Sequence, residues 1–192
     1  MILRTERLIL TTWQISEWTA FRPIAKDPEV MRYITGGIPW SDDEVQSFVD
    51  RQVKVYAERG YCRWKVIEQP TGEVIGFCGP GLWRDGWEPE IGWWLARRCW
   101  GRGLATEAAW AALGDAFERV RLNRLISVAM PANTASLRIM EKLGLRFESE
   151  FESDGIRLVQ YAIDRAAYER NTPSGRMRHV STDGEAPLEF PA

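Results

Sequence analysis

The sequence predicts one mixed α/β domain of the α+β type, with a mostly antiparallel central sheet flanked by helices. The hydrophobic periods run from several antiparallel strands to an alternation of strand, helix, strand, helix, strand and strand. Clusters of Gly, Pro, Asn and Asp separate these segments at the spacing of turns and helix caps. The chain has 192 residues, 45% hydrophobic and 27% charged, which is typical of a single soluble globular domain.

The first half of the chain combines two helices with four strands. Apolar residues at 7–13 predict an opening strand, and a helix is expected over 16–25. A second helix is expected to begin after Ser41, because this side chain can cap the first amides while Glu44 completes a capping box. The remaining strands are expected at 63–68, 74–78 and 90–95, with a turn at 69–72 and a hairpin signal at Asp85–Gly86.

The second half begins with the longest helical pattern. Alanines on one face predict a helix over 105–117 that packs closely on the sheet, because small side chains let the helix axis approach. A strand at 125–130 leads into a helix through Leu143, which Gly144 ends as a left-handed cap. The last two strands are expected at 147–152 and 157–163, joined by a turn at 153–155.

Composition sets the limits of the domain and its partners. The domain is expected to span residues 1–170, and the Gly, Pro, Ser and charged residues of 171–192 predict a flexible tail. No run approaches the ~18–20 apolar residues of a membrane span, and the N-terminus lacks a secretory layout, so a cytoplasmic protein without a membrane partner is expected. The 25 basic and 27 acidic side chains supply no broad cationic field, which disfavours nucleic-acid binding.

Cysteine and histidine usage argues against metal-dependent and nucleophilic mechanisms. Cys62, Cys78 and Cys99 are widely spaced and form no paired motif, which indicates reduced thiols and neither a disulfide framework nor a zinc site. The only histidine, His179, lies in the predicted tail, so triads built on histidine are disfavoured. No bound metal is expected.

The junction of the strand at 90–95 and the following helix carries the strongest functional signal. Gly101 and Gly103 lie in a short turn directly before the helix, where free amides and close backbone approach favour a phosphate or pyrophosphate. Arg98 and Arg102 could add positive charge. A tight turn that binds nothing is the structural alternative. The turn has neither the spacing nor the lysine of a P-loop. It also lacks the Rossmann fingerprint, because Thr106 stands where the third glycine would be.

Several motifs in order resemble the GNAT superfamily of N-acetyltransferases, in its branch of RimJ/RimL-type ribosomal-protein alanine acetyltransferase-like enzymes. The resemblance covers residues 3–168, and each motif is weak by itself but specific in combination. The matching segments are Thr5–Leu10, Asp27–Met31, Gly72–Gly76, Glu90–Leu95, Trp100–Ala108, Asn133–Ser136 and Glu141–Gly144.

The resemblance implies acetyl-CoA as the ligand of the anion site and a single GNAT domain as the fold. The backbone of Trp93, Trp94 and Leu95 would pair with the pantetheine arm like an added strand. Asn133 would contact the same arm, or serve only as a helix N-cap. The pyrophosphate would be held around the loop residues Arg98, Cys99, Trp100, Gly101, Arg102, Gly103 and Leu104.

The implied reaction is direct attack of an amine on the thioester, which asks for a base, an oxyanion donor and an acid. Glu90 is the expected base, acting through water, with a solvated carboxylate as the structural alternative. Ser136 is the expected acid, although a hydroxyl has a poor pKa for that role and could satisfy only local amides. Many family members place a tyrosine at the position of Met140, so this departure leaves the acid in doubt.

The acceptor is the least determined feature. Trp83 and Trp87 flank the turn before the cofactor strand, and we expect them to line an acceptor pocket, with core packing or a subunit interface as the alternative. The expected function is transfer of an acetyl group to a primary amine of a protein N-terminus, an amino acid or a small molecule. An acyl-CoA sensor without efficient turnover is the alternative, and a homodimer is compatible with the family.

Overall fold

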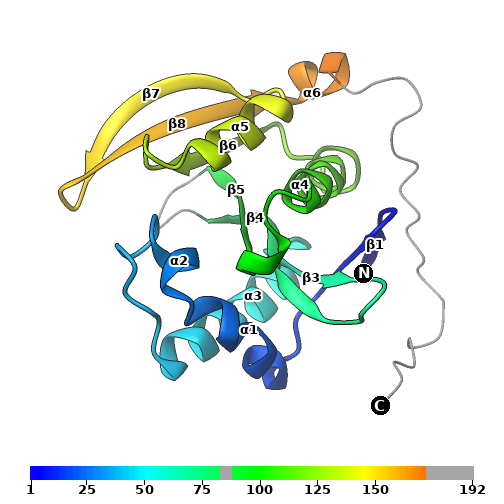
Figure 1. Ribbon diagram of the computed structural model, residues 1–192. Helices are drawn as coiled ribbons and strands as arrows, with labels where there is room; N and C mark the ends of the chain where they lie inside the picture. Colours follow the sequence, from blue (N-terminus) through cyan, green and yellow to red (C-terminus); the bar gives the residue numbers. More distant parts are fainter. Residues whose placement is uncertain (83–87, 172–192) are drawn as a thin grey trace.

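The computed structural model describes residues 1–82 and 88–171, which form one eight-stranded sheet with helices on both faces (Figure 1). The strand order is β1-β2-β3-β4-β5-β6-β8-β7, and all neighbours are antiparallel except β5 and β6. The strands are β1 (Ile2–Arg4), β2 (Leu8–Thr11), β3 (Trp64–Glu68), β4 (Val74–Leu82), β5 (Pro89–Leu95), β6 (Arg124–Ala129), β7 (Arg146–Ser153) and β8 (Ile156–Asp164). The α-helices are α1 (Trp18–Ala25), α2 (Pro28–Met31), α3 (Asp42–Arg59), α4 (Leu104–Gly114), α5 (Thr134–Lys142) and α6 (Arg165–Asn171).

This architecture confirms the predicted mixed domain, and local signals explain where its helices begin and end. The Ser41 side chain accepts a hydrogen bond from the Glu44 amide, and the Glu44 carboxylate accepts one from the Ser41 amide, which is the predicted capping box of α3. Gly60 ends α3, and Gly144 follows α5 at a φ of +83°. Both glycines adopt the left-handed conformation that satisfies the last carbonyls of a helix.

Several elements differ from the sequence-based expectation. The short strand β1 and the helices α2 and α6 were not predicted, since each is too short to show a full hydrophobic period. The β4 strand continues to Leu82, although its Gly and Pro residues had suggested an end near Cys78. The pattern at 105–117 is two pieces, because α4 ends at Gly114 and a π-helical turn follows at Asp115–Arg119.

The two faces of the sheet are covered by different kinds of side chain. On one face, alanines of α4 let this helix pack closely on β4 and β5, as predicted. The other face carries an aromatic cluster that joins α1, α3 and the sheet. Its members are Trp13, Phe21, Trp40, Phe48, Phe77 and Trp94, with neighbouring ring centroids 4.9–6.4 Å apart.

The predicted 171–192 tail lies outside the described residues except for Asn171, the last residue of α6. The same holds for His179 and for the Asp85–Gly86 hairpin signal. In the parts of the chain that are described, no helix has both the length and the apolar character needed to cross a membrane.

Candidate active site

Glu90 lies near the start of β5, where this strand still touches both of its neighbours. Its register partners are Gly81 on β4 and Ile126 on β6. The residue is only 6% exposed, which is unusual for a carboxylate without a partner. The expected base is therefore a buried group and not a solvated strand end.

Arg63, directly before β3, is the partner of this carboxylate. Its Nη2 lies 2.5 Å from Glu90 Oε2, and the Arg63 side chain is 16% exposed. Gly81 and Gly92 leave the space that the guanidinium occupies, because a Cβ would stand 2.6 Å from Nε at Gly81 and 2.9 Å from Nη1 at Gly92. The two glycines and the arginine form one spatial unit around Glu90.

Opposing influences act on the proton affinity of Glu90. Burial disfavours the charged form and raises the pKa of this carboxyl above its ordinary value. The charge and hydrogen bond of Arg63 and the backbone amide of Val128 pull the pKa of Glu90 down, but they do not offset the burial. A carboxylate whose pKa is raised is a stronger base than a solvated one.

Beyond Glu90, the edge of β5 that faces β6 is no longer paired with a strand. The strand pairs with β4 from Pro89 to Leu95, but its parallel pairing with β6 is confined to Glu90 and Ile126. On this edge the Ser127 hydroxyl donates to the Ile91 carbonyl at 2.9 Å, and the Trp100 indole N–H donates to the Leu95 carbonyl at 2.8 Å.

Trp93 lies midway between these two satisfied carbonyls. Because backbone groups facing one side recur at every second residue, the N–H and C=O of Trp93 point to the same edge as those of Ile91 and Leu95. An extended ligand could pair with Trp93 there as a further strand. On this edge, Trp93 is therefore the residue of the 93–95 segment whose backbone is open to a ligand, since the Leu95 carbonyl is bonded to Trp100.

The loop between β5 and α4 ends in an open helix start. Gly101 and Gly103 adopt φ values of +71° and +78°, which other residues rarely do. Gly103 is the N-cap of the eleven-residue α4, and no side chain caps its first amides. Residues 101–103 are exposed, so these amides and the helix dipole are available to an anion. Backbone and surroundings fit a pyrophosphate.

The two arginines that were expected to add charge already have acidic partners. Arg98 Nη2 lies 2.6 Å from Glu73, and Arg102 Nη2 lies 2.5 Å from Glu68. Each pair is close to neutral as a unit, so the backbone amides supply the larger share of the local attraction for an anion. No signal in the sequence indicated these partners, which lie at the ends of the β3–β4 turn.

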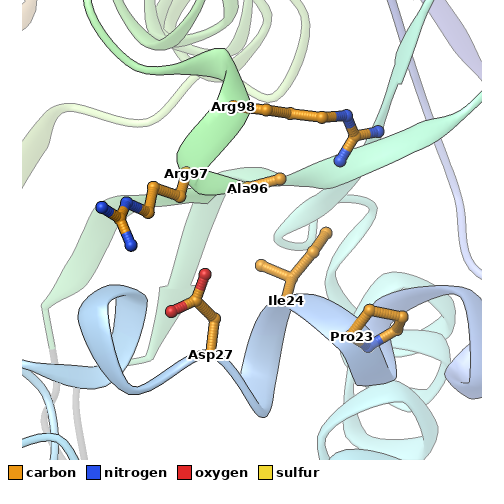
Figure 2. A pocket seen from close by; sticks show the side chains of 6 residues that line it. All are labelled: Pro23, Ile24, Asp27, Ala96, Arg97 and Arg98. Atoms are coloured by element: carbon orange, nitrogen blue, oxygen red, sulfur yellow. The ribbon is translucent and has the colours of Figure 1, made fainter.

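A cavity of about 220 Å³ adjoins the first turn of this loop (Figure 2). Ile24 and Pro23 of α1 form one wall, and Ala96 lies opposite. The charged ends of Asp27 and Arg97 extend toward each other across the opening. A ligand held by the loop could extend into this space.

Asn133 and Ser136 lie at the start of α5, after the strand that runs parallel to β5. Parallel strands end at the same edge of a sheet, so this helix start is on the same side as the loop between β5 and α4. The Asn133 side chain accepts a hydrogen bond from the Ser136 amide at 3.3 Å, which makes it the N-cap of α5. Met140 is 1% exposed and belongs to the core.

Other candidates remain outside the site or unconnected to it. Trp83 and Trp87, the expected acceptor-pocket residues, lie outside the described residues. Cys99 is buried beside the loop, and burial raises the pKa of its thiol. Across residues 1–82 and 88–171, no group of three His, Cys, Asp or Glu side chains is arranged to hold a metal ion.

The candidate site thus consists of a strand with one free edge, a buried carboxylate at one end of that strand, and an uncapped helix start at the other end. The chain belongs to the GNAT acetyltransferase family. Residues 7–146 match the family model described as an acetyltransferase (GNAT) domain, and the single GNAT domain expected from the sequence is thereby confirmed.

Individual relatives agree with this assignment. The chain is 30% identical over 152 residues to YnaD of Bacillus subtilis, described as an uncharacterized N-acetyltransferase, covering 79% of this chain and 86% of the relative. A crystal structure of a GNAT-family acetyltransferase from Bacillus anthracis superposes with a TM-score of 0.73 at 27% identity, covering 86% and 99% of the two chains. RimL, a ribosomal L7/L12 alpha-N-protein acetyltransferase in complex with coenzyme A, shares the fold with a TM-score of 0.73 at 18% identity, covering 87% and 99%.

Proposed function

We propose that the protein transfers an acetyl group from acetyl-CoA to a primary amine by direct attack of the amine on the thioester. The observation that carries this proposal is the layout of β5, which joins the buried Glu90 to the exposed glycine loop through a strand with one free edge. The coenzyme A bound to the RimL neighbour supports the same choice of ligand. Acetyl-CoA supplies an activated carbonyl carbon when bound.

Each part of the chain has a distinct task in this reaction. The amides of residues 101–104 bind the pyrophosphate, since those of Cys99 and Trp100 already donate to the carbonyls of Ala96 and Arg97. The Trp93 backbone holds the pantetheine arm, with Asn133 at the same end of the sheet. Glu90 accepts the proton from the acceptor nitrogen, through a water molecule, as the nitrogen–carbon bond forms and the carbon–sulfur bond breaks. A backbone N–H of β5 stabilises the oxyanion, and Ser136 donates a proton to the departing thiolate.

The acceptor approaches from the aromatic face of the sheet. Glu90 and Trp94 are four residues apart on β5, an even number, so their side chains share one face of the sheet. Trp40 packs on Trp94 at 4.9 Å between ring centroids. The acceptor class stays open between a protein N-terminus, an amino acid and a small amine. We propose the RimJ/RimL branch, and with it a protein N-terminus as the acceptor, because RimL, a ribosomal L7/L12 alpha-N-protein acetyltransferase, has the same fold. A cytoplasmic location and a homodimer remain part of the same proposal.

Calorimetric titration with acetyl-CoA, CoA and ATP tests the cofactor. We expect saturable binding of acetyl-CoA that Gly103→Val abolishes, because valine is strained at a φ of +78° and crowds the anion site. Gly155→Val in the β7–β8 turn is the matched control, since Gly155 has a φ of +73° and lies far along the chain from the loop. Preference for ATP, or no binding of acetyl-CoA, would contradict the proposal.

Turnover is tested by release of free CoA thiol with a panel of peptide N-termini, amino acids and polyamines. Thiol release with one acceptor class supports the transferase and names the class. Tight acetyl-CoA binding without thiol release for any amine favours the sensor alternative, for which the apolar Met140 at the usual tyrosine position is the supporting observation.

A further inference from the structure

Glu107, in the first turn of α4, is held by three hydrogen-bond donors and an ion pair from the β1–β2 connection. Thr5 Oγ1 donates to Oε1 at 2.6 Å, and the Arg7 amide donates to the same oxygen at 2.9 Å. The Arg7 side chain donates to Oε2 through Nε at 2.7 Å, and its Nη2 forms an ion pair with the same oxygen at 2.6 Å. The carboxylate thereby holds one side of the guanidinium.

The same guanidinium also holds the phosphate loop. Arg7 Nη1 donates to the carbonyl oxygen of Arg102 at 3.0 Å, one residue before the N-cap of α4. Arg7 therefore bridges the last peptide of the loop and the first turn of the helix. The ion pair is half-exposed, with the Arg7 side chain 42% and the Glu107 side chain 16% exposed.

This bridge sets the direction of an anion-binding amide. In a trans peptide the C=O and the following N–H point in opposite directions. Because Arg7 binds the Arg102 carbonyl, the Gly103 N–H is directed away from Arg7 and toward the open end of α4. Glycine at 103 would otherwise sample both signs of φ, so the peptide needs an outside contact to keep one orientation.

We propose that Arg7 and Glu107 are positioning residues that preorganise the Gly103 amide for the pyrophosphate of acetyl-CoA. The proposal rests on the proposed cofactor. Arg7 acts through its hydrogen-bond geometry and not through its charge, since the charge is neutralised by Glu107 and the three guanidinium nitrogens are all engaged. The pyrophosphate binds an amide that is already oriented. The conformational entropy of the loop is therefore lost when the protein folds and does not weaken the binding of the cofactor.

Three variants separate geometry from charge. Arg7→Met removes both, Arg7→Lys keeps the charge but lacks the fork that joins Glu107 to Arg102, and Glu107→Gln keeps the shape but removes the anion that orients Arg7. Arg22→Met is the matched control, because Arg22 is 46% exposed and paired with Asp42 at 2.8 Å on other elements.

Binding is measured by calorimetry with acetyl-CoA, and kcat/KM is compared between acetyl-CoA and S-acetylpantetheine, a donor without the pyrophosphate. We expect Arg7→Met and Arg7→Lys to weaken acetyl-CoA binding by roughly tenfold each and to leave kcat/KM for S-acetylpantetheine within about twofold. Glu107→Gln should behave likewise with a smaller loss. Hydrogen exchange of amides 101–104 in the ligand-free protein should be faster in all three variants and unchanged in Arg22→Met.

Two results would overturn the proposal. Full acetyl-CoA affinity in Arg7→Lys would mean that the charge alone matters, and equal losses for both donors would mean a general structural defect. If the native protein fails to bind acetyl-CoA, the proposed cofactor is wrong. The exchange rates then still decide whether Arg7 orders the loop, so the two failures are distinguishable.

Discussion

The two ends of β5 use the same residue types for opposite purposes. At the Glu90 end, Gly92 and Gly81, which lies opposite Glu90 on β4, provide space for the Arg63 side chain, and the Arg63–Glu90 ion pair is largely buried. At the loop end, Gly101 and Gly103 provide positive φ values in exposed backbone. Glycine therefore serves packing at one end and backbone conformation at the other, although Gly92 is only nine and eleven residues from Gly101 and Gly103.

The arginine–carboxylate pairs differ in the same way. Breaking a buried pair such as Arg63–Glu90 leaves an uncompensated charge and costs about 3–5 kcal/mol. An exposed pair such as Arg98–Glu73 contributes about 0–1 kcal/mol. We therefore expect changes at the Glu90 end to affect chemistry and stability, and changes at the loop end to affect cofactor binding.

Glu90→Gln should have the largest effect, and it tests most directly whether the two ends of β5 have different roles. We expect kcat to fall by about 10²–10⁴-fold, because the amide cannot accept a proton, while the Kd of acetyl-CoA stays unchanged. Glu88→Gln is the matched control, since Glu88 is an exposed carboxylate just before β5 that pairs with Arg124.

Loss of stability could imitate this effect, because Glu90→Gln leaves Arg63 buried without its anion. The double variant Glu90→Gln/Arg63→Met removes both charges, and we expect it to regain Tm but not turnover. Turnover in the double variant would mean that Glu90 is not the base.

Arg63→Met should shift the acid limb of the kcat profile. Arg63 lowers the pKa of Glu90, so its removal raises this pKa further. The base then takes up its proton at higher pH, and the acid limb moves to higher pH by about 1–3 units. Steady-state rates between pH 5 and 9 measure the shift, and Arg98→Met at the loop end should leave the profile in place. A shift to lower pH in Arg63→Met would contradict the assignment.

Gly92→Ala tests whether the glycine at this position makes room for Arg63, and the expected change in kcat is smaller. The added methyl group should displace the Arg63 guanidinium from Glu90 and lower kcat by roughly tenfold in the native background. In an Arg63→Ala background the same substitution has nothing to displace, and we expect little further change. Additive losses in the double variant would show that Gly92 acts independently of Arg63.

Ser136→Ala should have the smallest effect. A hydroxyl is far from the ideal pKa of a general acid, and the Ser136 amide is already bonded to Asn133, so we expect kcat to fall by roughly tenfold or less. Ser47→Ala, an exposed serine on α3, provides the control for both kcat and Tm. A loss as large as that of Glu90→Gln would make Ser136 a principal catalytic group.

The sequence by itself was sufficient for the elements whose signals are local. The capping box of α3, the glycine after α5, the alanine face of α4 and the order of strands are all specified within a few neighbouring residues. The glycine loop before α4 belongs to the same group, because the two glycines and the helix start are adjacent in the chain. The identities of the catalytic and cofactor-binding residues stay predictions.

Only the tertiary structure revealed what surrounds these elements. Arg63 and Glu90 are 27 residues apart, and Arg7 and Glu107 are 100 residues apart, so no spacing rule pairs them. The free edge of β5 likewise depends on where β6 diverges from it. Conformational preferences act over one or two turns of chain, whereas burial and side-chain pairing depend on which distant segments the fold brings together. For that physical reason the glycine loop and the start of α4 could be predicted from the sequence, whereas the partners of Glu90 and Glu107 depended on the fold.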